Sequence, residues 1–320
     1  MSSAALDRVF AIEAVRVTEA AAIACARQIG RGDEHAADQA AVEAMRKAFN
    51  QLPIDGTVVI GEGERDEAPM LFIGEKVGAG GVAVDIALDP LEGTTLTAKA
   101  LPNALAVMAI AEPGTLLNAP DTYMDKIAIG GGYKDGVIDL DASPADNIHS
   151  LAKSKGVPAH EITALILDRP RHSAIIEAVR KTGAAVQLIT DGDVAGVIAT
   201  SDPATGIDIY IGQGGAPEGV LAAAALRCIG GQIQTRLVFR NDDERARAAK
   251  WGVKDLKKKY TLMDLASGDV IFAATGVTNG SMLSGVHMDR EHITTESIVM
   301  RSATGTVRWV KTRHKRKHGG

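Results

Sequence analysis

Residues 82–95 read VAVDIALDPLEGTT, and the rest of the chain is organised around this stretch. Its first half is apolar and rich in β-branched residues, which predicts a buried strand; Pro90 should end it, because proline has no N–H for the ladder. Gly93 permits a sharp turn. Asp89 and Glu92 can then converge while the amides at and after Gly93 open toward the same point, which suits a divalent cation and a phosphate. The alternative is a strand-to-helix turn with capping acids.

Length and composition predict a globular protein that can bury a sizeable core. The chain has 320 residues, 46% of them hydrophobic, and a formal net charge of −5. This length holds two domains or one large layered domain. No run approaches the roughly 20 apolar residues of a membrane span, and charges within the N-terminal apolar stretch favour an amphipathic helix over a signal peptide. The acidic balance and an aromatic content of 3% argue against a nucleic-acid surface.

The two cysteines carry no predicted chemistry. Cys25 and Cys228 each lie in an alanine-rich helical context, so we expect small core residues in a reducing compartment. We therefore expect a cytoplasmic protein with no nucleic-acid or membrane partner, and a homo-oligomer, either a dimer or a tetramer. The basic end, KTRHKRKHGG at 311–320, is expected to be a solvated terminus.

Two acids in the first part of the chain are candidate ligands. A first helix is predicted over about residues 7–29 and a second helix over about residues 35–52. The second helix turns the Asp38 side chain inward, where a carboxylate needs a partner. Asp38 is therefore either a helix N-cap or a metal ligand. A strand over 57–60 is followed by the charged run GEGERDEAP. That run fits a solvated loop, but Glu62 directly follows the strand between two glycines, which permit close backbone approach.

A helix, a further strand and the roles of two residues are predicted around the central strand. A helix over about residues 70–77 leads into the strand, and a further core strand covers 103–111. Asp85 shares a strand face with Asp89, but four residues of strand span about 13 Å, so we interpret Asp85 as structural. Tyr123 lies in a predicted loop, where its ring serves either hydrogen bonding or packing.

The second part of the chain alternates strands and helices. We place a boundary near Val157, which divides the chain into a metal-binding α/β half at 1–156 and a βα half at 157–320. The order βαβαβα predicts a mostly parallel sheet, and such sheets bind ligands beyond the carboxyl ends of their strands. Polar clusters follow three of these strands: Asp168-Arg169-Pro170-Arg171, Asp191-Gly192-Asp193 and Gly214-Gly215-Ala216-Pro217-Glu218. A last strand and a hairpin end the chain.

Two of these clusters point to anion or metal binding. The guanidinium forks of Arg169 and Arg171 suit a phosphate. Glu218 follows a proline at a helix start, where the helix dipole favours a carboxylate in any case, so it is either a helix-start acid or a ligand.

In this order, the segments GRGD, VVIGEGE, DEAPML, DPLEGTT, LNAPDTYMDKIA, RPRH, TDGDVAG and GGAPEGV resemble the class II fructose-1,6-bisphosphatases, the bacterial GlpX-type family. This family belongs to the lithium-sensitive, metal-dependent sugar and inositol phosphatases, and the resemblance runs over about residues 13–308. It implies a layered α/β fold, an αβαβα sandwich with two sheets between helix layers. The implied reaction is hydrolysis of the 1-phosphate of fructose 1,6-bisphosphate, a step of gluconeogenesis and sugar-phosphate cycling.

The resemblance also implies roles for individual residues, with Mg²⁺ or Mn²⁺ as the cofactor. One ion is assigned to Asp38 and Glu62, and another to Asp89, Glu92 and Glu218. Substrate contacts carry over to Glu92, Gly93, Thr94, Tyr123, the segment from Asp168 through Arg169 and Pro170 to Arg171, Asp191, Gly192, Asp193 and Gly215. The catalytic set is Thr94, which orients or deprotonates the attacking water through an acid, with Glu62 and Asp89.

Two positions depart from the family pattern, and rival functions remain. The family commonly has lysine where this chain has Glu34 and Arg169; the first change reverses the charge and puts any role of that lysine in doubt. Sedoheptulose 1,7-bisphosphate is the rival substrate, alone or as a second activity. Inositol monophosphate fits less well, because the second half carries a separate phosphate anchor. A silent phosphosugar-binding protein is disfavoured because every predicted ligand is present.

Overall fold

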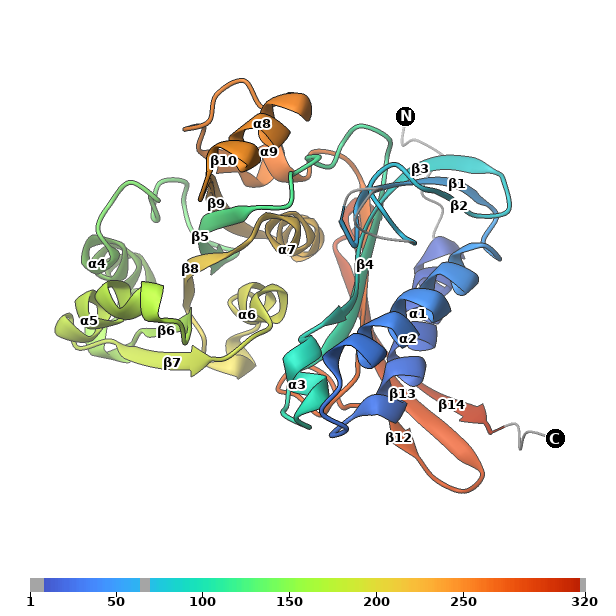
Figure 1. The fold of residues 1–320 in the computed structure, drawn as a ribbon. Coiled ribbons are helices and arrows are strands. Elements are labelled where there is room, and N and C mark those ends of the chain that lie inside the picture. The colour runs from blue at the N-terminus through green and yellow to red at the C-terminus, as the bar shows by residue number, and fades with distance from the viewer. Residues whose placement is uncertain (1–8, 64–69, 317–320) are drawn as a thin grey trace. The chain divides into compact units, whose positions relative to one another are not determined.

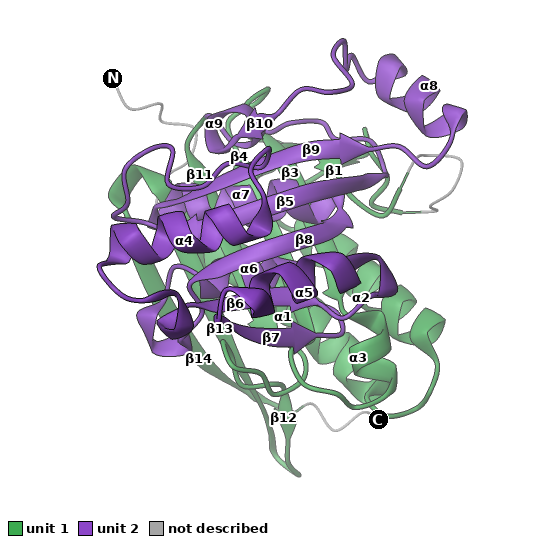
Figure 2. Ribbon diagram, turned by 90° about the vertical axis from the view of Figure 1, so that its left-hand side faces the viewer, with its two compact units in different colours: residues 1–115, 268–320 green, residues 116–267 purple. Residues whose placement is uncertain are grey.

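The structure is a computed structural model that describes residues 9–63 and 70–316 (Figure 1). The chain forms two compact units, residues 1–115 with 268–320 and residues 116–267 (Figure 2). This division differs from the predicted boundary near Val157. The reason is strand pairing: residues 123–130 pair within the sheet of the second unit, whereas the last strands return to the sheet of the first.

Unit 1 contains an eight-stranded mixed sheet. Its strands are β1 (Ile54–Ile60), β2 (Lys76–Val77), β3 (Val82–Glu92), β4 (Leu105–Ala111), β11 (Val270–Gly276), β12 (His287–Met288), β13 (His292–Arg301) and β14 (Thr306–Lys315). They lie in the order β12-β13-β11-β4-β3-β1-β2, with β14 on β13. β1 and β3 run parallel and the other pairs antiparallel. The predicted final strand and hairpin are confirmed as β11 and β13–β14, and β14 extends through residues 311–315 of the basic end.

Helices cover one face of this sheet (Figure 1). They are α1 (Val9–Cys25), the 3₁₀ turn Ala26–Gln28, α2 (Glu34–Phe49) and the short α3 (Thr94–Ala98). Met45 and Phe49 of α2 are fully buried in one core cluster with Ile86 of β3 and Met108 of β4. Apolar burial along this face of α2 holds the helix on the sheet.

Two predictions about the strands of unit 1 are wrong. β3 does not end at Pro90: its pairing to β4 shifts register between Asp89 and Glu92 and then resumes, so the missing N–H falls in a bulge, where proline is tolerated. Residues 70–77 form turns and β2 instead of a helix. Leu71 and Gly74 have φ angles of 55° and 94°, in the left-handed region, which a right-handed helix cannot accommodate.

Unit 2 contains a six-stranded sheet in the order β10-β9-β5-β8-β6-β7. Its strands are β5 (Tyr123–Gly130), β6 (Thr163–Leu167), β7 (Ala185–Ile189), β8 (Ile209–Gly215), β9 (Gly231–Val238) and β10 (Tyr260–Thr261). The helices are α4 (Pro144–Lys155), α5 (Ser173–Lys181), α6 (Asp193–Ala199), α7 (Ala216–Ile229), α8 (Asp242–Lys250) and α9 (Leu262–Leu265). Short 3₁₀ turns cover Ala159–Glu161, Pro170–His172 and Pro203–Thr205, and Ser302–Thr304 forms one in unit 1.

The sheet of unit 2 is only partly parallel. β6 pairs in parallel with β7 and β8, as predicted, but β5 pairs antiparallel with β8 and β9. The alternating pattern of residues 161–228 did not include β5, whose first residues, 123–126, were expected in a loop. α4 and α5 lie on one face of this sheet and α6 and α7 on the other (Figure 1).

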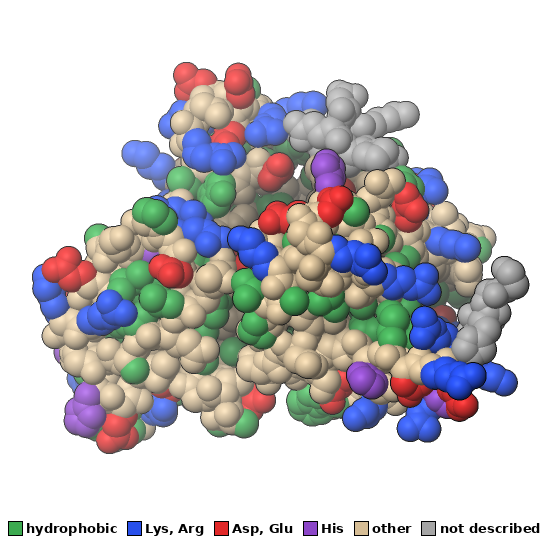
Figure 3. Space-filling view, turned by 60° about the horizontal axis from the view of Figure 1, so that its bottom comes forward, with side chains coloured by type: hydrophobic (Ala, Val, Ile, Leu, Met, Phe, Trp, Pro, Cys, Tyr) green, Lys and Arg blue, Asp and Glu red, His purple; other side chains and the backbone are tan. Residues whose placement is uncertain are grey.

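The predicted class, a layered mixed α/β fold with two sheets and helices packed on them, is confirmed. Cys25 and Cys228 are buried, as expected of core residues. Across the described residues, every helix is too short or too polar to cross a bilayer. On the face shown in Figure 3, acidic and basic side chains are interspersed.

Candidate active site

A β-bulge turns Asp89 and Glu92 to the same face of the first sheet. Asp89 pairs with Val107 of β4 and Glu92 pairs with Leu105, so three steps along β3 face two along β4. Directly opposed residues of an antiparallel pair lie on the same face, and Leu105 and Val107 are two residues apart. In a regular strand, a spacing of three would place the two carboxylates on opposite faces. The bulge therefore produces the convergence that the sequence predicted.

The turn after β3 has the conformation that its glycine allows. Gly93 is in the left-handed region, with φ of 92° and ψ of 54°, and it is the N-cap of α3. Thr94 is therefore the first residue of α3, and the N-cap is Gly93. The Glu92 residue is buried, at 4% exposure. Thr94, on the other side of Gly93 in the chain, is half-buried.

The start of α2 is held beside this turn. In the loop before α2, the Gly30 amide donates to the Thr97 carbonyl at 2.9 Å and the Gly32 amide donates to the Ala98 carbonyl at 3.0 Å. Both acceptors belong to α3. The GRGD segment thus connects the helix that carries Asp38 to the helix that begins at Thr94.

Asp38 lies in the second turn of α2 and does not cap it. The N-cap is Asp33, whose carboxylate accepts a hydrogen bond from the Ala36 amide at 2.9 Å. Burial raises the pKa of Asp38, while His35 lowers it. A carboxylate in such surroundings favours a nearby cation. Metal ligation therefore stays the prediction for Asp38, and the N-cap interpretation is wrong.

Glu62 directly follows β1, and backbone hydrogen bonds join its segment to residues 71–73, which precede β2. Its amide donates to the Leu71 carbonyl at 3.1 Å, and the Ile73 amide donates to the Gly63 carbonyl at 3.0 Å. A Cβ at Gly61 would lie 2.1 Å from the Leu71 carbonyl oxygen, so the glycine permits this close approach. Residues 64–69 of the same charged run lie outside the described residues.

In unit 2, strand topology gathers four chain segments at one edge of the sheet. The carboxyl ends of β6, β7 and β8 lie there because these strands are parallel. The antiparallel register pairs Tyr123, the first residue of β5, with Gly215 at the end of β8 and with Val238 at the end of β9. The prediction that Tyr123 lies in a loop is wrong, and the sheet positions its ring.

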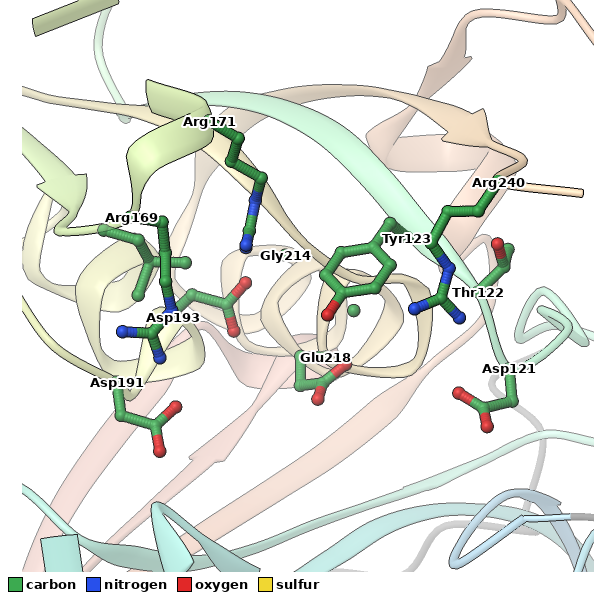
Figure 4. Close-up of a pocket in the computed structure, with 12 residues that line it drawn as sticks. Asp121, Thr122, Tyr123, Arg169, Arg171, Asp191, Asp193, Gly214, Glu218 and Arg240 are labelled. Atoms are coloured by element: carbon green, nitrogen blue, oxygen red, sulfur yellow. The ribbon is translucent and has the colours of Figure 1, made fainter. Parts of the chain in front are cut away.

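A pocket of about 330 Å³ opens at this edge (Figure 4). Its lining contains three guanidiniums, four carboxylates and the Tyr123 ring. The lining residues are Asp121, Thr122, Tyr123, Leu167, Arg169, Arg171, Asp191, Asp193, Gly214, Gly215, Glu218 and Arg240. The structure therefore brings together most of the substrate-binding residues predicted in the second half of the chain.

A buried histidine fixes the segment with the two predicted arginines. Nε2 of His172 accepts a hydrogen bond from the Gln213 amide at 2.9 Å, so its Nδ1 carries the proton and donates to the Leu167 carbonyl at 2.7 Å. Burial lowers the pKa of His172, which favours this neutral form. Nη2 of Arg171 donates to the Gln213 carbonyl at 2.7 Å. The RPRH turn is thus bound to the end of β8.

The Asp193 carboxylate is bound by a buried lysine. Nζ of Lys126 lies 2.5 Å from Oδ2 of Asp193, and the two side chains are 1% and 7% exposed. A Cβ at Gly214 would lie 2.1 Å from the same oxygen, and a Cβ at Gly219 would lie 3.3 Å from Cε of Lys126. Two glycines therefore leave room for the ion pair. Asp193 also lines the pocket, and its contact with substrate stays a prediction.

We expect Lys126→Met to lower the free energy of unfolding by about 3 kcal/mol, because a buried carboxylate then loses its cation. Urea unfolding followed by circular dichroism measures this. Lys155→Met is the matched control: Lys155 pairs with Asp208 at 2.5 Å but is 38% exposed, so its loss should cost no more than about 1 kcal/mol. Equal losses from both variants would contradict a shielded pair.

Glu218 lies in the first turn of α7, as predicted. Its Oε2 is buried and has no hydrogen-bond partner among the described residues. Burial first, and then the charge of Asp193, raise the pKa of Glu218 to about 7. A shielded oxygen ligand of this kind fits a hard divalent cation, which would take the place of the proton. A bound cation would account for the buried Oε2 atom of Glu218, which a position at the start of a helix does not explain by itself.

The two units supply different parts of the predicted metal set. Asp38, Glu62, Asp89 and Glu92 belong to unit 1, and Glu218 belongs to unit 2. Over residues 9–63 and 70–316, no three His, Cys, Asp or Glu side chains form a group arranged to hold a metal ion. The assignment of these five acids to two ions stays a prediction.

Sequence analysis missed three residues of the unit 2 site. His172 is the last letter of RPRH, Lys126 belongs to a segment expected as a loop, and Arg240 follows a strand that the alternating pattern did not reach. The available signal for Lys126 was a lysine inside YMDKIAIG that alternates with Met124 and Ala128, which places it on the buried face of the strand. For Arg240 the signal was its place just after β9, in which buried and part-buried residues alternate.

Comparison with known proteins identifies the family of this chain. The family model described as "Bacterial fructose-1,6-bisphosphatase, glpX-encoded" matches residues 8–314. The fructose-1,6-bisphosphatase 1 class 2 of Escherichia coli K12 is 47% identical over 324 aligned positions, which cover 97% of this chain and 96% of the relative. The class 2 enzyme of Shigella flexneri matches with the same identity and coverage. The chain therefore belongs to the family of bacterial, glpX-encoded fructose-1,6-bisphosphatases.

Proposed function

We propose that this chain is a divalent-metal-dependent phosphatase that hydrolyses the 1-phosphate of fructose 1,6-bisphosphate to fructose 6-phosphate and phosphate. Its relatives carry the name of that activity. The observation that carries the proposal is the bulge in β3, which directs Asp89 and Glu92 to one face next to the turn at Gly93. Paired carboxylates beside backbone amides are suited to bind a phosphate through a cation.

In this proposal, five carboxylates hold two cations. Asp38 and Glu62 hold one, and Asp89, Glu92 and Glu218 hold the other. When bound, Mg²⁺ or Mn²⁺ neutralises the charge of the phosphate and lowers the pKa of a bound water. The residues of the chain orient the phosphate, exclude bulk water and supply the group that takes the proton.

Thr94 is proposed to act on the attacking water. It is the first residue after Gly93, two residues beyond Glu92 in the chain, and it is half-buried. A threonine hydroxyl is a weak base by itself, so we assign it the orientation of the water and the passage of its proton to an acid. Glu62 and Asp89 complete the proposed catalytic set as metal-holding acids.

The pocket of unit 2 is proposed to bind the phosphate that is not cleaved. Arg171 lies with its guanidinium carbon 5.0 Å from the centre of the Tyr123 ring, and Arg169 lines the same pocket (Figure 4). Guanidiniums bind phosphate oxygens through paired hydrogen bonds without needing a metal. Binding energy at this remote phosphate would align the reacting one.

The experiment that tests the function is phosphate release from fructose 1,6-bisphosphate. We expect turnover with Mg²⁺ or Mn²⁺, none after treatment with EDTA, and recovery when either ion is restored. Sedoheptulose 1,7-bisphosphate and inositol monophosphate serve as comparison substrates. Turnover that persists in EDTA would refute the metal dependence, and turnover of inositol monophosphate alone would refute the assigned substrate.

Arg171→Ala should reduce kcat/KM for the bisphosphate by roughly tenfold or more, since a hydrogen bond to a charged group contributes about 1.5–3 kcal/mol. An aryl phosphate has no second phosphate, so its hydrolysis should change little. Steady-state assays of both substrates on the same preparation measure the difference. The same loss for both would place Arg171 at the cleaved phosphate or in the fold.

We also propose a cytoplasmic homo-oligomer, a dimer or tetramer, that acts in gluconeogenesis. Both cysteines, Cys25 and Cys228, are buried as small core residues, which is the usual place of cysteines in proteins of a reducing compartment. Light scattering coupled to size-exclusion chromatography would measure the assembly, and a monomeric mass would refute this part.

A further inference from the structure

Arg240 is the third guanidinium of the unit 2 pocket and has no role in the proposed mechanism so far. It follows β9, which runs antiparallel to β5, so the chain leaves the sheet beside Tyr123. Figure 4 shows Arg240 and Arg171 approaching the Tyr123 ring from different sides. Their guanidinium carbons lie 4.7 Å and 5.0 Å from the ring centre, within the range of cation–π contact.

We propose that Arg240 is a further substrate-binding residue, which contacts the uncleaved phosphate of the sugar bisphosphate together with Arg171 and supports the Tyr123 ring. This inference rests on the proposed function. Nothing in the sequence motifs or in the names of the relatives assigns this arginine a role.

A buried carboxylate fixes the Arg240 side chain. Oε1 of Glu244 lies 2.6 Å from Nε and 2.5 Å from Nη2 of Arg240. Oε2 accepts hydrogen bonds from the Arg240 amide at 2.7 Å and from the Thr122 hydroxyl at 3.0 Å. Glu244 is 1% exposed, whereas Arg240 is 58% exposed. A shielded acid therefore orients a cation that remains accessible from the pocket.

The pairing with Glu244 leaves Arg240 able to bind a second anion. Glu244 engages the Nε and Nη2 edge of the guanidinium, and a guanidinium has five N–H donors, so the Nη1 side can bind a phosphate oxygen. Burial raises the pKa of Glu244, but hydrogen bonds from Arg240 and Thr122 outweigh that effect and lower it. Glu244 therefore stays charged and keeps the side chain ordered before any ligand arrives, which reduces the entropic cost of binding.

The position of Arg240 favours the binding of an anion in the pocket. With Arg171 it places positive charge on two sides of one aromatic ring, and like charges that face one cavity repel each other. A phosphate dianion at the edge of the ring would relieve that repulsion and bind both guanidiniums. The positive charge of Arg240 also offsets the negative charges of Asp121 and Asp191, which line the same pocket.

Binding of fructose 6-phosphate to the full chain in EDTA tests this inference without turnover, because this sugar carries only the uncleaved phosphate. By isothermal titration calorimetry, Arg240→Ala should raise Kd at least about tenfold, and Arg240→Lys, which keeps the charge and loses the fork, should raise it less. Arg245→Ala is the matched control, because Arg245 lies on the exposed side of α8 in a pair with Asp242. It should leave Kd unchanged.

Turnover separates a substrate contact from a structural role. With Mn²⁺, Arg240→Ala should raise KM for fructose 1,6-bisphosphate at least about tenfold and leave kcat and the hydrolysis of an aryl phosphate nearly unchanged. Unchanged Kd and KM in Arg240→Ala, with wild-type protein that binds fructose 6-phosphate, would overturn this inference alone. If Arg240→Ala does not fold, wild-type Kd in Arg240→Lys would overturn it. Wild-type protein that releases phosphate from fructose 1,6-bisphosphate but does not bind fructose 6-phosphate would overturn this inference and not the proposed function. Wild-type protein that does not release phosphate with Mn²⁺ would overturn both.

Discussion

Replacing Thr94 by alanine is expected to lower kcat for fructose 1,6-bisphosphate by about 10²- to 10⁴-fold, the usual contribution of a group that takes part in proton transfer. KM should change little, because the hydroxyl acts on the water and not on the bound sugar. Thr94→Ser keeps a hydroxyl at the first position of α3 and should retain much of the rate. Initial rates of phosphate release over a range of substrate concentrations measure both constants.

The neighbouring residue provides the control for this prediction. Thr95 lies in the same short helix and is also half-buried, but no role in the reaction is assigned to it. Thr95→Ala should therefore keep kcat within a small factor of the wild type. If Thr94→Ser were as damaging as Thr94→Ala, the defect would come from packing of the turn, and the role of the hydroxyl would be refuted.

Asp89→Asn and Glu92→Gln should each lower kcat by at least about 100-fold, the scale for removing one preorganised electrostatic contact to the transition state. Both changes keep the size of the side chain and remove its charge, so the loss should come with weaker Mn²⁺ binding. Titration of Mn²⁺ by calorimetry, together with the rate at saturating Mn²⁺, separates the two effects.

Asp85→Asn is the matched control on the same strand. The Asp85 carboxylate accepts a hydrogen bond from the Gly114 amide at 2.6 Å, in agreement with its interpretation as a structural residue. We expect this variant to bind Mn²⁺ like the wild type and to lose thermal stability instead. Near-normal turnover in Asp89→Asn or Glu92→Gln would count against direct metal ligation by that residue.

The sequence predicted the site best where chemistry and strand ends coincide. DPLEGTT, RPRH, TDGDVAG and GGAPEG each lie just beyond a β-branched or apolar run, so local pattern was enough to place Glu92, Arg171 and Glu218 at strand ends or helix starts. The convergence of Asp89 and Glu92 was also predicted, but for an incomplete reason. The bulge that produces it depends on the pairing of β3 with β4, which no local pattern specifies.

Features that depend on long-range pairing could not be predicted in this way. β5 joins the second sheet through pairing with β8 and β9, and this pairing defines the positions of Tyr123, Lys126 and Arg240 together. The return of β11 and β13 to the first sheet makes unit 1 discontinuous in sequence. The prediction of a helix over residues 70–77 was wrong because Leu71 adopts a left-handed backbone conformation. The high helix propensity of leucine gives no sign of this conformation.

In the proposed function, Asp89, Glu92 and Glu218 are ligands of a single divalent cation. Anomalous diffraction from crystals grown with Mn²⁺ tests this claim most directly. We predict an anomalous peak within about 2.5 Å of a carboxylate oxygen from each of the three residues. A peak bound by Asp89 and Glu92 with Glu218 more than about 10 Å away, beyond the reach of any shared ligand sphere, would contradict it.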